Sequence, residues 1–356
     1  MKKIGILIYD FSAVGGAEKV AKNLANEFSK KNEVFVITLF ETVEKEHEAK
    51  YRYIKMFEKK IGITVNLMKI SKKLKKILID NSIDILLLIT AGVNTVGVLS
   101  TIGTRVKTIY CEHSNLENRT YGKKHIFRQW IGAKFADMIV TLTDRDKTNF
   151  KIKFAVKDSK VISIPNWVEN SLNLSKYDIF SKKIITVGRL ERVKGYDKLI
   201  EVAKIVKMYH PDWKWDIFGN GSMYEELNEK IKKEELEDFL FLKGNTKNIE
   251  NIYRQYSFFV MTSYYEGLPL VLLEAQMNSL PIISFDCPTG PSEIIDNDEN
   301  GYLIKCYDVK QMANKIIDLI ECEQIRKSFS IKSDKNLKKY SKQEVLKKWN
   351  DLIVSM

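Results

Sequence analysis

The segment "SFFVMTSYYEGLPLVLLEAQM", residues 257–277, decides the fold class, because it passes from a buried strand through a turn into a helix. Its first part, "SFFVMTS", has the continuous apolar run of a fully buried strand. Its last part, "PLVLLEAQM", predicts a helix with Pro269 in the first turn, where a missing N–H is tolerated. A strand followed by a helix in this way is the building unit of a parallel sheet covered by helices.

The same plan recurs along the whole chain. Short β-branched runs are separated by segments of roughly 10–18 residues, which are long enough for crossover helices. The predicted strands of the first half are residues 2–10, 32–40, 83–90, 107–112, 137–143 and 160–166. Those of the second half are residues 183–189, 213–219, 238–244, 257–263, 281–286 and 301–306.

The length of 356 residues suits two domains. Apolar periodicity lapses in "PNWVENSLNLSKYD", so we place an N-terminal domain at 1–168 and a C-terminal domain at 169–340. The final segment, residues 341–356, predicts an amphipathic helix that packs back on the first domain. The expected fold class is α/β, with two Rossmann-like parallel-sheet domains whose ligand-binding edges face a shared cleft.

Composition argues against several classes of protein. The longest apolar run, residues 85–93, is too short to span a bilayer, and residues 1–11 predict a first buried strand rather than a signal peptide. The four cysteines include no Cys-x-x-Cys pair and the four histidines lack metal-ligand spacing, so we expect neither a zinc site nor a disulfide framework. The acidic run "DND" at 296–298 predicts a solvated turn. A reduced cytosol is the default location.

Two glutamates flank the turn of the opening segment. Glu266 lies in the turn and Glu274 in the second turn of the predicted helix. A carboxylate accepts hydrogen bonds from hydroxyls, and the free N–H groups that follow Gly267 and Leu268 favour an anion. The pattern suits a ligand with a diol at each end and phosphates between, as in a nucleotide sugar. Glu274 can alternatively be a solvated helix residue, an interpretation that is weaker for Glu266.

A second loop supplies positive charge. In "TVGRLERVKGYDKLI", Arg189 and Lys194 lie five residues apart between a strand and a helix. Both can clamp a diphosphate, arginine as a planar fork and lysine as a point charge. Surface cations are common in a chain with 58 lysines and arginines, so this motif gains its weight from the glutamate pair.

The Glu-x₇-Glu spacing, "VGRLERVKG" and the amino-terminal "GGAEKVAKNLA" together resemble the family-four retaining glycosyltransferases of GT-B fold. The resemblance covers nearly the whole chain and is closest to bacterial enzymes that build surface glycans. It implies that Glu274 holds the ribose hydroxyls, that Glu266 contacts the donor sugar, and that no metal is needed. One departure is local: "MNSL" precedes Pro281 where the family usually has a small residue and a glycine.

Other candidates have structural alternatives. Gly15 and Gly16 can bring backbone N–H groups to a phosphate or sugar, although a tight turn explains Gly15 equally well. Gly219 and Gly221 can admit the nucleotide base, with a plain turn as a strong competitor. By the resemblance, His113 at a strand end is a candidate acceptor-side contact or proton handler, and a structural histidine is the equal alternative.

Charge is distributed unevenly. Residues 1–170 contain 30 Lys/Arg and 18 Asp/Glu, whereas the remainder contains 28 of each, so the first half should meet an anionic partner. "KKLKKIL" (72–78) and "YGKKHIFRQWIGAKFA" (121–136) can lie at an anionic membrane surface. Both can also be ordinary amphipathic helices, the favoured interpretation for 72–78. No nucleic-acid-binding motif is present.

These patterns and the resemblance together predict a hexosyltransferase without a cofactor. The resemblance implies that the enzyme retains the anomeric configuration and needs no metal. Its donor would be a nucleotide-diphosphate sugar, with UDP favoured because most relatives use it. Its acceptor would be a growing, lipid-linked surface glycan at the cytoplasmic face of the membrane. The alternatives are a nucleotide-sugar epimerase of the same fold and a catalytically silent nucleotide-sugar-binding scaffold.

Overall fold

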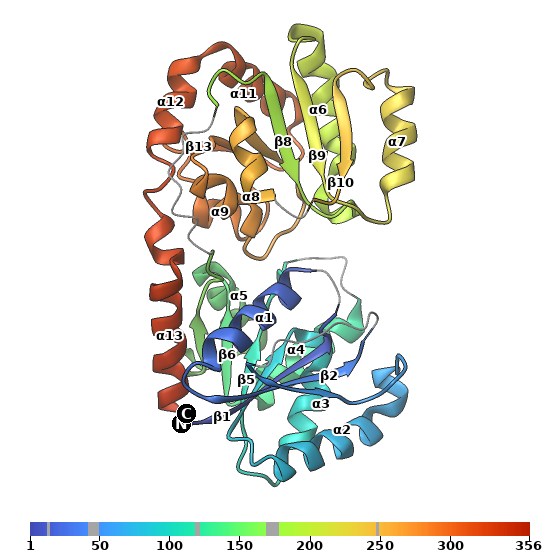
Figure 1. The fold of residues 1–356 in the computed structure, drawn as a ribbon, viewed down its shortest axis with the longest axis vertical. Helices are drawn as coiled ribbons and strands as arrows, with labels where there is room; N and C mark the ends of the chain where they lie inside the picture. Colours follow the sequence, from blue (N-terminus) through green and yellow to red (C-terminus); the bar gives the residue numbers. More distant parts are fainter. Residues whose placement is uncertain (13–14, 42–49, 118–121, 169–177, 247–248) are drawn as a thin grey trace. The chain divides into compact units, whose positions relative to one another are not determined.

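The computed structural model contains two compact units, each with its own sheet (Figure 1). Unit 1 comprises Met1–Asn166 and Lys347–Met356, and unit 2 comprises Trp167–Leu346. The structure describes residues 1–12, 15–41, 50–117, 122–168, 178–246 and 249–356. Because each unit combines a parallel sheet with helices, the predicted α/β class is confirmed.

Unit 1 contains a seven-stranded sheet in the order β3-β2-β1-β4-β5-β6-β7, with parallel pairing throughout. Its strands are β1 (Lys3–Asp10), β2 (Glu33–Phe40), β3 (Arg52–Lys55), β4 (Ile85–Ile89), β5 (Lys107–Cys111), β6 (Met138–Thr141) and β7 (Val161–Ser163). Its helices are α1 (Gly16–Phe28), α2 (Ile63–Asp80), α3 (Ala91–Thr101), α4 (Lys123–Phe135) and α5 (Asp144–Phe154). The strand order reverses between β1 and β4, the kind of point where ligands bind in open α/β sheets.

Unit 2 contains a six-stranded sheet in the order β10-β9-β8-β11-β12-β13, again parallel. Its strands are β8 (Lys183–Val187), β9 (Lys214–Phe218), β10 (Leu240–Gly244), β11 (Phe258–Met261), β12 (Ile282–Phe285) and β13 (Gly301–Ile304). Its helices are α6 (Tyr196–Tyr209), α7 (Tyr224–Lys233), α8 (Ile249–Ile252), α9 (Leu270–Met277), α10 (Pro291–Ile294), α11 (Val309–Glu321) and α12 (Glu323–Ile331). Here the order reverses between β8 and β11.

The last helix, α13 (Lys342–Ser355), begins in unit 2, and its residues from Lys347 onward belong to unit 1. Within unit 1 the ring of Trp349 packs against Phe28 of α1, with the ring centroids 5.8 Å apart. An amphipathic helix at the end of the chain therefore contributes an aromatic side chain to the first unit.

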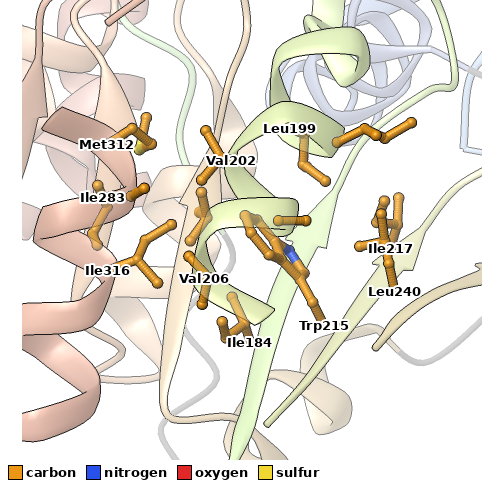
Figure 2. Packing of buried hydrophobic residues seen from close by; sticks show 14 of the residues in the cluster. Ile184, Leu199, Val202, Val206, Trp215, Ile217, Leu240, Ile283, Met312 and Ile316 are labelled. Atoms are coloured by element: carbon orange, nitrogen blue, oxygen red, sulfur yellow. The ribbon is translucent and has the colours of Figure 1, made fainter. Parts of the chain in front are cut away.

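A cluster of buried apolar side chains holds α6 and α11 against the sheet of unit 2 (Figure 2). Val206 comes from α6, Ile316 from α11 and Trp215 from β9, and all three are fully buried. The indole Nε1 of Trp215 donates a hydrogen bond to Thr186 Oγ1 at 3.0 Å. Burial of each such aliphatic side chain stabilises the fold by about 1.5–3 kcal/mol. This core fixes the strands whose ends carry the candidate site.

Every strand predicted from the sequence is present, and β3 is the additional one in the described part of the chain. β3 was missed because "RYIK" is short, partly exposed and paired only with β2 at the sheet edge. The position of Pro269 was wrong by one residue: α9 begins at Leu270, and Pro269 precedes it with an extended ψ of 99°. Its φ of −73° is the value that the proline ring imposes.

Candidate functional site

The turn between β11 and α9 brings two of the sequence-predicted residues together. Lys194 Nζ donates to Glu266 Oε1 at 2.6 Å, and their side chains are only 19% and 11% exposed. Glu274 lies farther along, in the second turn of α9. The predicted cation and the predicted carboxylate therefore form one mostly buried ion pair beside the start of a helix.

Backbone contacts explain why these two loops meet. The N–H of Tyr264 donates to Val193 O at 2.8 Å, and Thr262 Oγ1 donates to Lys194 O at 3.1 Å. Gly195, at the start of α6, has φ +66°, and a Cβ there would collide with the carbonyl of Thr262. Only glycine combines this left-handed backbone with so close an approach, so Gly195 sets the position of Lys194.

The loop after β12 closes the other side of Glu266. Thr289 Oγ1 donates to Glu266 O at 2.8 Å. The thiol of Cys287 is buried, and burial together with the Glu266 carboxylate raises its pKa well above the ordinary value. Cys287 therefore packs beside this turn as an uncharged thiol.

Glu274 has its own support. Its Oε2 accepts a hydrogen bond from the hydroxyl of Tyr253 at 3.1 Å, and Tyr253 is fully buried. Leu268 is also buried, so a ligand at this turn would meet the backbone of Gly267 and Leu268 rather than the leucine side chain. A carboxylate aimed by a buried phenol is well suited to accept hydrogen bonds from a diol.

Arg189 lines a pocket of unit 2 with a volume of about 220 Å³. This volume is below the roughly 300–1,000 Å³ of a whole ligand site, so it suits one part of a ligand. The pocket is lined by Val187, Gly188, Arg189, Phe218, Gly219, Asn220, Asn245, Thr246 and Ile249. Gly188 lies beside the Lys194 side chain, whose Cδ and Cε would be 3.7 Å from a Cβ at that position.

Gly219 and Gly221 differ in their relation to this pocket. Gly219 lines the pocket and has a φ of +144°. The carbonyl oxygen of Gly188 occupies the position where a Cβ of residue 219 would lie. Gly221 does not line the pocket and instead packs against the backbone of Leu190. Close packing of two loops accounts for both glycines, and only Gly219 is also in reach of a ligand in the pocket.

In unit 1, Gly15 and Gly16 lie where β1 leads into α1. Gly15 precedes the helix in an extended conformation, and Gly16 is its first residue and is exposed. Apart from the chain neighbours of Gly16 and the backbone of α1, no described atom lies within 4 Å of the position that a Cβ on Gly16 would occupy. The carboxylate of Glu18, in the first turn of α1, lies beside Gly15, with Oε2 close to the position that a Cβ there would occupy. A negative charge of the chain itself is therefore already present at this helix start, where anions are favoured.

His113 follows β5 and is a partly buried side chain. Burial lowers its pKa from 6.5 to about 4, so the imidazole is neutral near pH 7. Its Nε2 is buried and has no hydrogen-bond partner among the described residues.

Glu112, next to His113, is a buried polar residue that was not predicted from the sequence. It is 2% exposed and accepts hydrogen bonds from the Ser114 N–H and from Gln129 Nε2, both at 2.9 Å. The hydroxyls of Tyr110 and Ser114 also donate to it. Its position directly after a buried strand is the feature of the sequence from which a structural role for Glu112 could have been predicted. Its four donors show that it fixes the loop carrying His113.

Two further properties of the described residues concern metal ligation and membrane spanning. The described residues contain no group of three or more His, Cys, Asp or Glu that could hold a metal ion. Asp298 lies in a turn with φ +62°, and its N–H donates to Gly301 O at 2.9 Å. In the described part of the chain, every helix is too short or too polar to cross a bilayer.

Two family descriptions match the chain. Glycosyl transferases group 1 matches residues 176–344, and Glycosyltransferase Family 4 matches residues 14–172. The amylovoran biosynthesis glycosyltransferase AmsD of Erwinia amylovora is 32% identical over 99% of this chain and 100% of its own length. A Campylobacter jejuni enzyme is 25% identical over 100% of this chain and 99% of its own. It is named GalNAc-alpha-(1->4)-GalNAc-alpha-(1->3)-diNAcBac-PP-undecaprenol alpha-1,4-N-acetyl-D-galactosaminyltransferase.

Solved structures support the same fold. A variant of Staphylococcus aureus TarM, in complex with Fondaparinux, alpha-GlcNAc-glycerol and UDP, has a TM-score of 0.83 at 18% identity. The match covers 99% of both chains. At this identity the likeness shows the GT-B fold, and the full-length similarity to AmsD shows the family. The chain belongs to the bacterial glycosyltransferases of GT-B fold that act in surface-polysaccharide biosynthesis.

Proposed function

We propose that this glycosyltransferase moves a hexose-type sugar from UDP to a growing, lipid-linked surface glycan, with retention of anomeric configuration and without a metal ion. The observation that carries the proposal is the ion pair of Lys194 and Glu266 at the turn before α9, with Glu274 held one helical turn farther on. The relatives named above support a glycan acceptor, and the UDP in the TarM complex supports a uridine donor.

Each donor-side residue has a role in this proposal. Glu274 accepts hydrogen bonds from the ribose hydroxyls, and Glu266 accepts them from the sugar. Arg189 and Lys194 bind the diphosphate, while the backbone of Gly267 and Leu268 lies against it. Gly219 lies near the base, with Gly221 supporting its loop. In unit 1, Gly15 and Gly16 offer N–H groups and His113 lies on the acceptor side.

The proposed reaction proceeds at one face of the sugar. The bond from the anomeric carbon to the nucleotide phosphate breaks, and a bond to the acceptor hydroxyl forms on the same face. The leaving phosphate oxygen takes the proton of that hydroxyl. Lys194 and Arg189 stabilise the negative charge that develops on the departing diphosphate, which replaces the role of a metal. The enzyme works at the cytoplasmic face of the membrane, where such acceptors grow.

Glu266→Ala tests the proposal, with Glu225→Gln as a control because Glu225 is exposed on α7. The variant should bind UDP about as well as the unaltered protein and transfer labelled sugar at least about a hundredfold more slowly, by loss of transition-state contacts. Unchanged transfer by Glu266→Ala would contradict the assigned role. Conversion of the donor sugar without any acceptor would favour an epimerase instead.

A further inference from the structure

One surface of unit 1 exposes an unusual amount of apolar side chain. Phe127, Trp130 and Phe135 of α4 are 56%, 43% and 55% exposed, and we call them the aromatic patch. The rings of Phe127 and Trp130 are stacked with centroids 5.9 Å apart, and Trp130 meets Phe135 edge-on at 6.1 Å. Single exposed apolar residues are ordinary, but three touching aromatic rings mark an interaction site.

A groove lies beside the aromatic patch. Its volume is about 730 Å³, within the range of sites that take small organic ligands. Its apolar lining comes from α2, α3 and α4 and the loop after α3, and includes Leu67, Leu99, Ile102, Phe127, Ile131 and Phe135. The groove also reaches Lys107 and Asp137, where β5 and β6 begin. The groove therefore lies at the amino ends of these strands, whereas Glu112 and His113 follow the carboxyl end of β5.

Lys107, at the end of the groove, pairs with Asp137 at 3.1 Å, but several other cations of α2, α4 and the loop after α3 do not form ion pairs with described residues. In the part of the chain that the structure describes, none of the following makes an ion pair: Lys72, Lys76, Arg105, Lys123, Lys124, Arg128 and Lys134. Helix α4 contains no acidic residue. In unit 2, by contrast, Lys204 pairs with Glu234 and Lys207 with Asp238. The positive charge of α2 and α4 is thus available to an external anion.

We propose that the aromatic patch and its groove dock on an anionic phospholipid bilayer. Aromatic rings favour the boundary between head groups and acyl chains, and nearby lysines and arginines attract the lipid phosphates. The groove takes the end of an acyl chain. A second copy of this chain fits poorly, because a two-fold contact would bring the same unpaired cations face to face. The proposal does not depend on the transfer reaction.

Trp130 reports the contact directly. It is the exposed tryptophan of the five, since Trp167, Trp213, Trp215 and Trp349 are at most 5% exposed. Vesicles of equal parts phosphatidylcholine and phosphatidylglycerol should shift the tryptophan emission of the full chain to the blue, and brominated acyl chains should quench it. Phosphatidylcholine vesicles should do neither. Trp130→Phe should still sediment with the anionic vesicles but lose the spectral change.

Two variants and a matched control complete the test. Phe127→Ser/Trp130→Ser/Phe135→Ser and Lys123→Glu/Lys124→Glu should each lower the affinity for anionic vesicles at least about tenfold. Lys232→Glu/Lys233→Glu changes the net charge equally, on exposed residues of α7, and should bind nearly as the unaltered chain does. Circular dichroism and UDP binding check that each variant is folded.

Three outcomes would overturn the proposal. The first is that the full chain does not bind the anionic vesicles, and the second is that the α7 control loses as much affinity as the α4 variants. The third is a dimer in sedimentation that the aromatic variant dissociates while vesicle binding is unchanged, which would assign the surface to a second copy. Loss of vesicle binding with intact sugar transfer in solution leaves the proposed function standing.

Discussion

Lys194 and Glu266, 72 residues apart in sequence, form an ion pair of 2.6 Å in unit 2 with both side chains mostly buried. The lysine comes from the loop after β8 and the glutamate from the loop after β11, the two strands between which the sheet order reverses. A binding site is expected at such a point. The pair also gives Lys194 a carboxylate that an incoming diphosphate can replace.

Replacement of Lys194 should affect both stability and turnover. Lys194→Ala removes the lysine partner of a mostly buried carboxylate, so we expect a loss of about 1–3 kcal/mol in the free energy of unfolding. We also expect a fall in kcat/KM of at least about a hundredfold, because a charge on the departing diphosphate is no longer stabilised. Urea unfolding and initial rates measure the two effects.

Lys198→Ala is the control for that change. Lys198 pairs with Glu201 on α6, but Glu201 is largely exposed, so little stability should be lost. If Lys194→Ala transfers sugar as fast as Lys198→Ala does, the lysine has no part in the reaction.

Tyr253→Phe should weaken donor binding without changing the chemistry. The phenol donates a hydrogen bond to Glu274 at 3.1 Å. Loss of this bond should weaken the free energy of donor binding by about 1 kcal/mol, which raises the KM for the donor about fivefold. The kcat should change little, because in the proposed donor site Glu274 contacts the ribose rather than the reacting carbon. Initial rates at varied donor concentration give both constants. A large fall in kcat with constant KM would place Glu274 at the reacting centre instead.

Gly195→Ala and Gly244→Ala form a matched pair. Their φ angles are +66° and +68°, so an alanine is strained at either position by about 1–2 kcal/mol. A Cβ at 195 also collides with the carbonyl of Thr262, whereas one at 244 has no described atom within 4 Å apart from its chain neighbours. Gly195→Ala should therefore be clearly less stable in urea and should lose donor binding. Equal effects of the two variants would show that the loop contact at Thr262 is unimportant.

The lowered pKa of the partly buried His113 side chain predicts a dependence of stability on pH. An unfolded histidine takes up its proton near pH 6.5, whereas burial holds the pKa of His113 at about 4. Between these values the unfolded state binds more protons, so the stabilisation present above pH 6.5 is lost as the pH falls towards 4. The loss is at most about 1.4 kcal/mol per pH unit.

His113→Gln removes this contribution. The urea midpoint should fall less between about pH 7.5 and pH 5 in the variant than in the unaltered chain. The reason is that unfolding of the variant no longer takes up the proton that His113 binds in the unfolded state. An identical drop in both proteins would mean that His113 titrates normally in the folded state.

The fold was largely predictable because its strands carry their own signal. Runs such as "ILLLI" in β4 are buried along their whole length, so burial and sequence coincide. β3 lacked that signal, since Arg52–Lys55 owes its place to pairing with β2 alone. The local sequence pattern predicts strands whose residues are all apolar and buried, and it misses strands that depend on pairing with a neighbouring strand.

The site was predictable as a set of residue types but not as contacts. Spacing pointed to Lys194, Glu266 and Glu274, yet nothing local to them reveals the ion pair or the buried hydroxyl of Tyr253 behind Glu274. The four donors around Glu112 likewise come from β5, its following loop and α4. Such contacts depend on how distant loops pack, which a single sequence does not encode in any short window.

The most direct test of the donor site is a calorimetric titration with UDP, GDP and ADP in excess EDTA, for the unaltered chain and for Lys194→Ala. We expect UDP to bind the unaltered chain in one-to-one stoichiometry without metal, and to bind the variant at least about tenfold more weakly. Absence of binding by all three nucleotides, or UDP binding that is the same in both proteins, would contradict it.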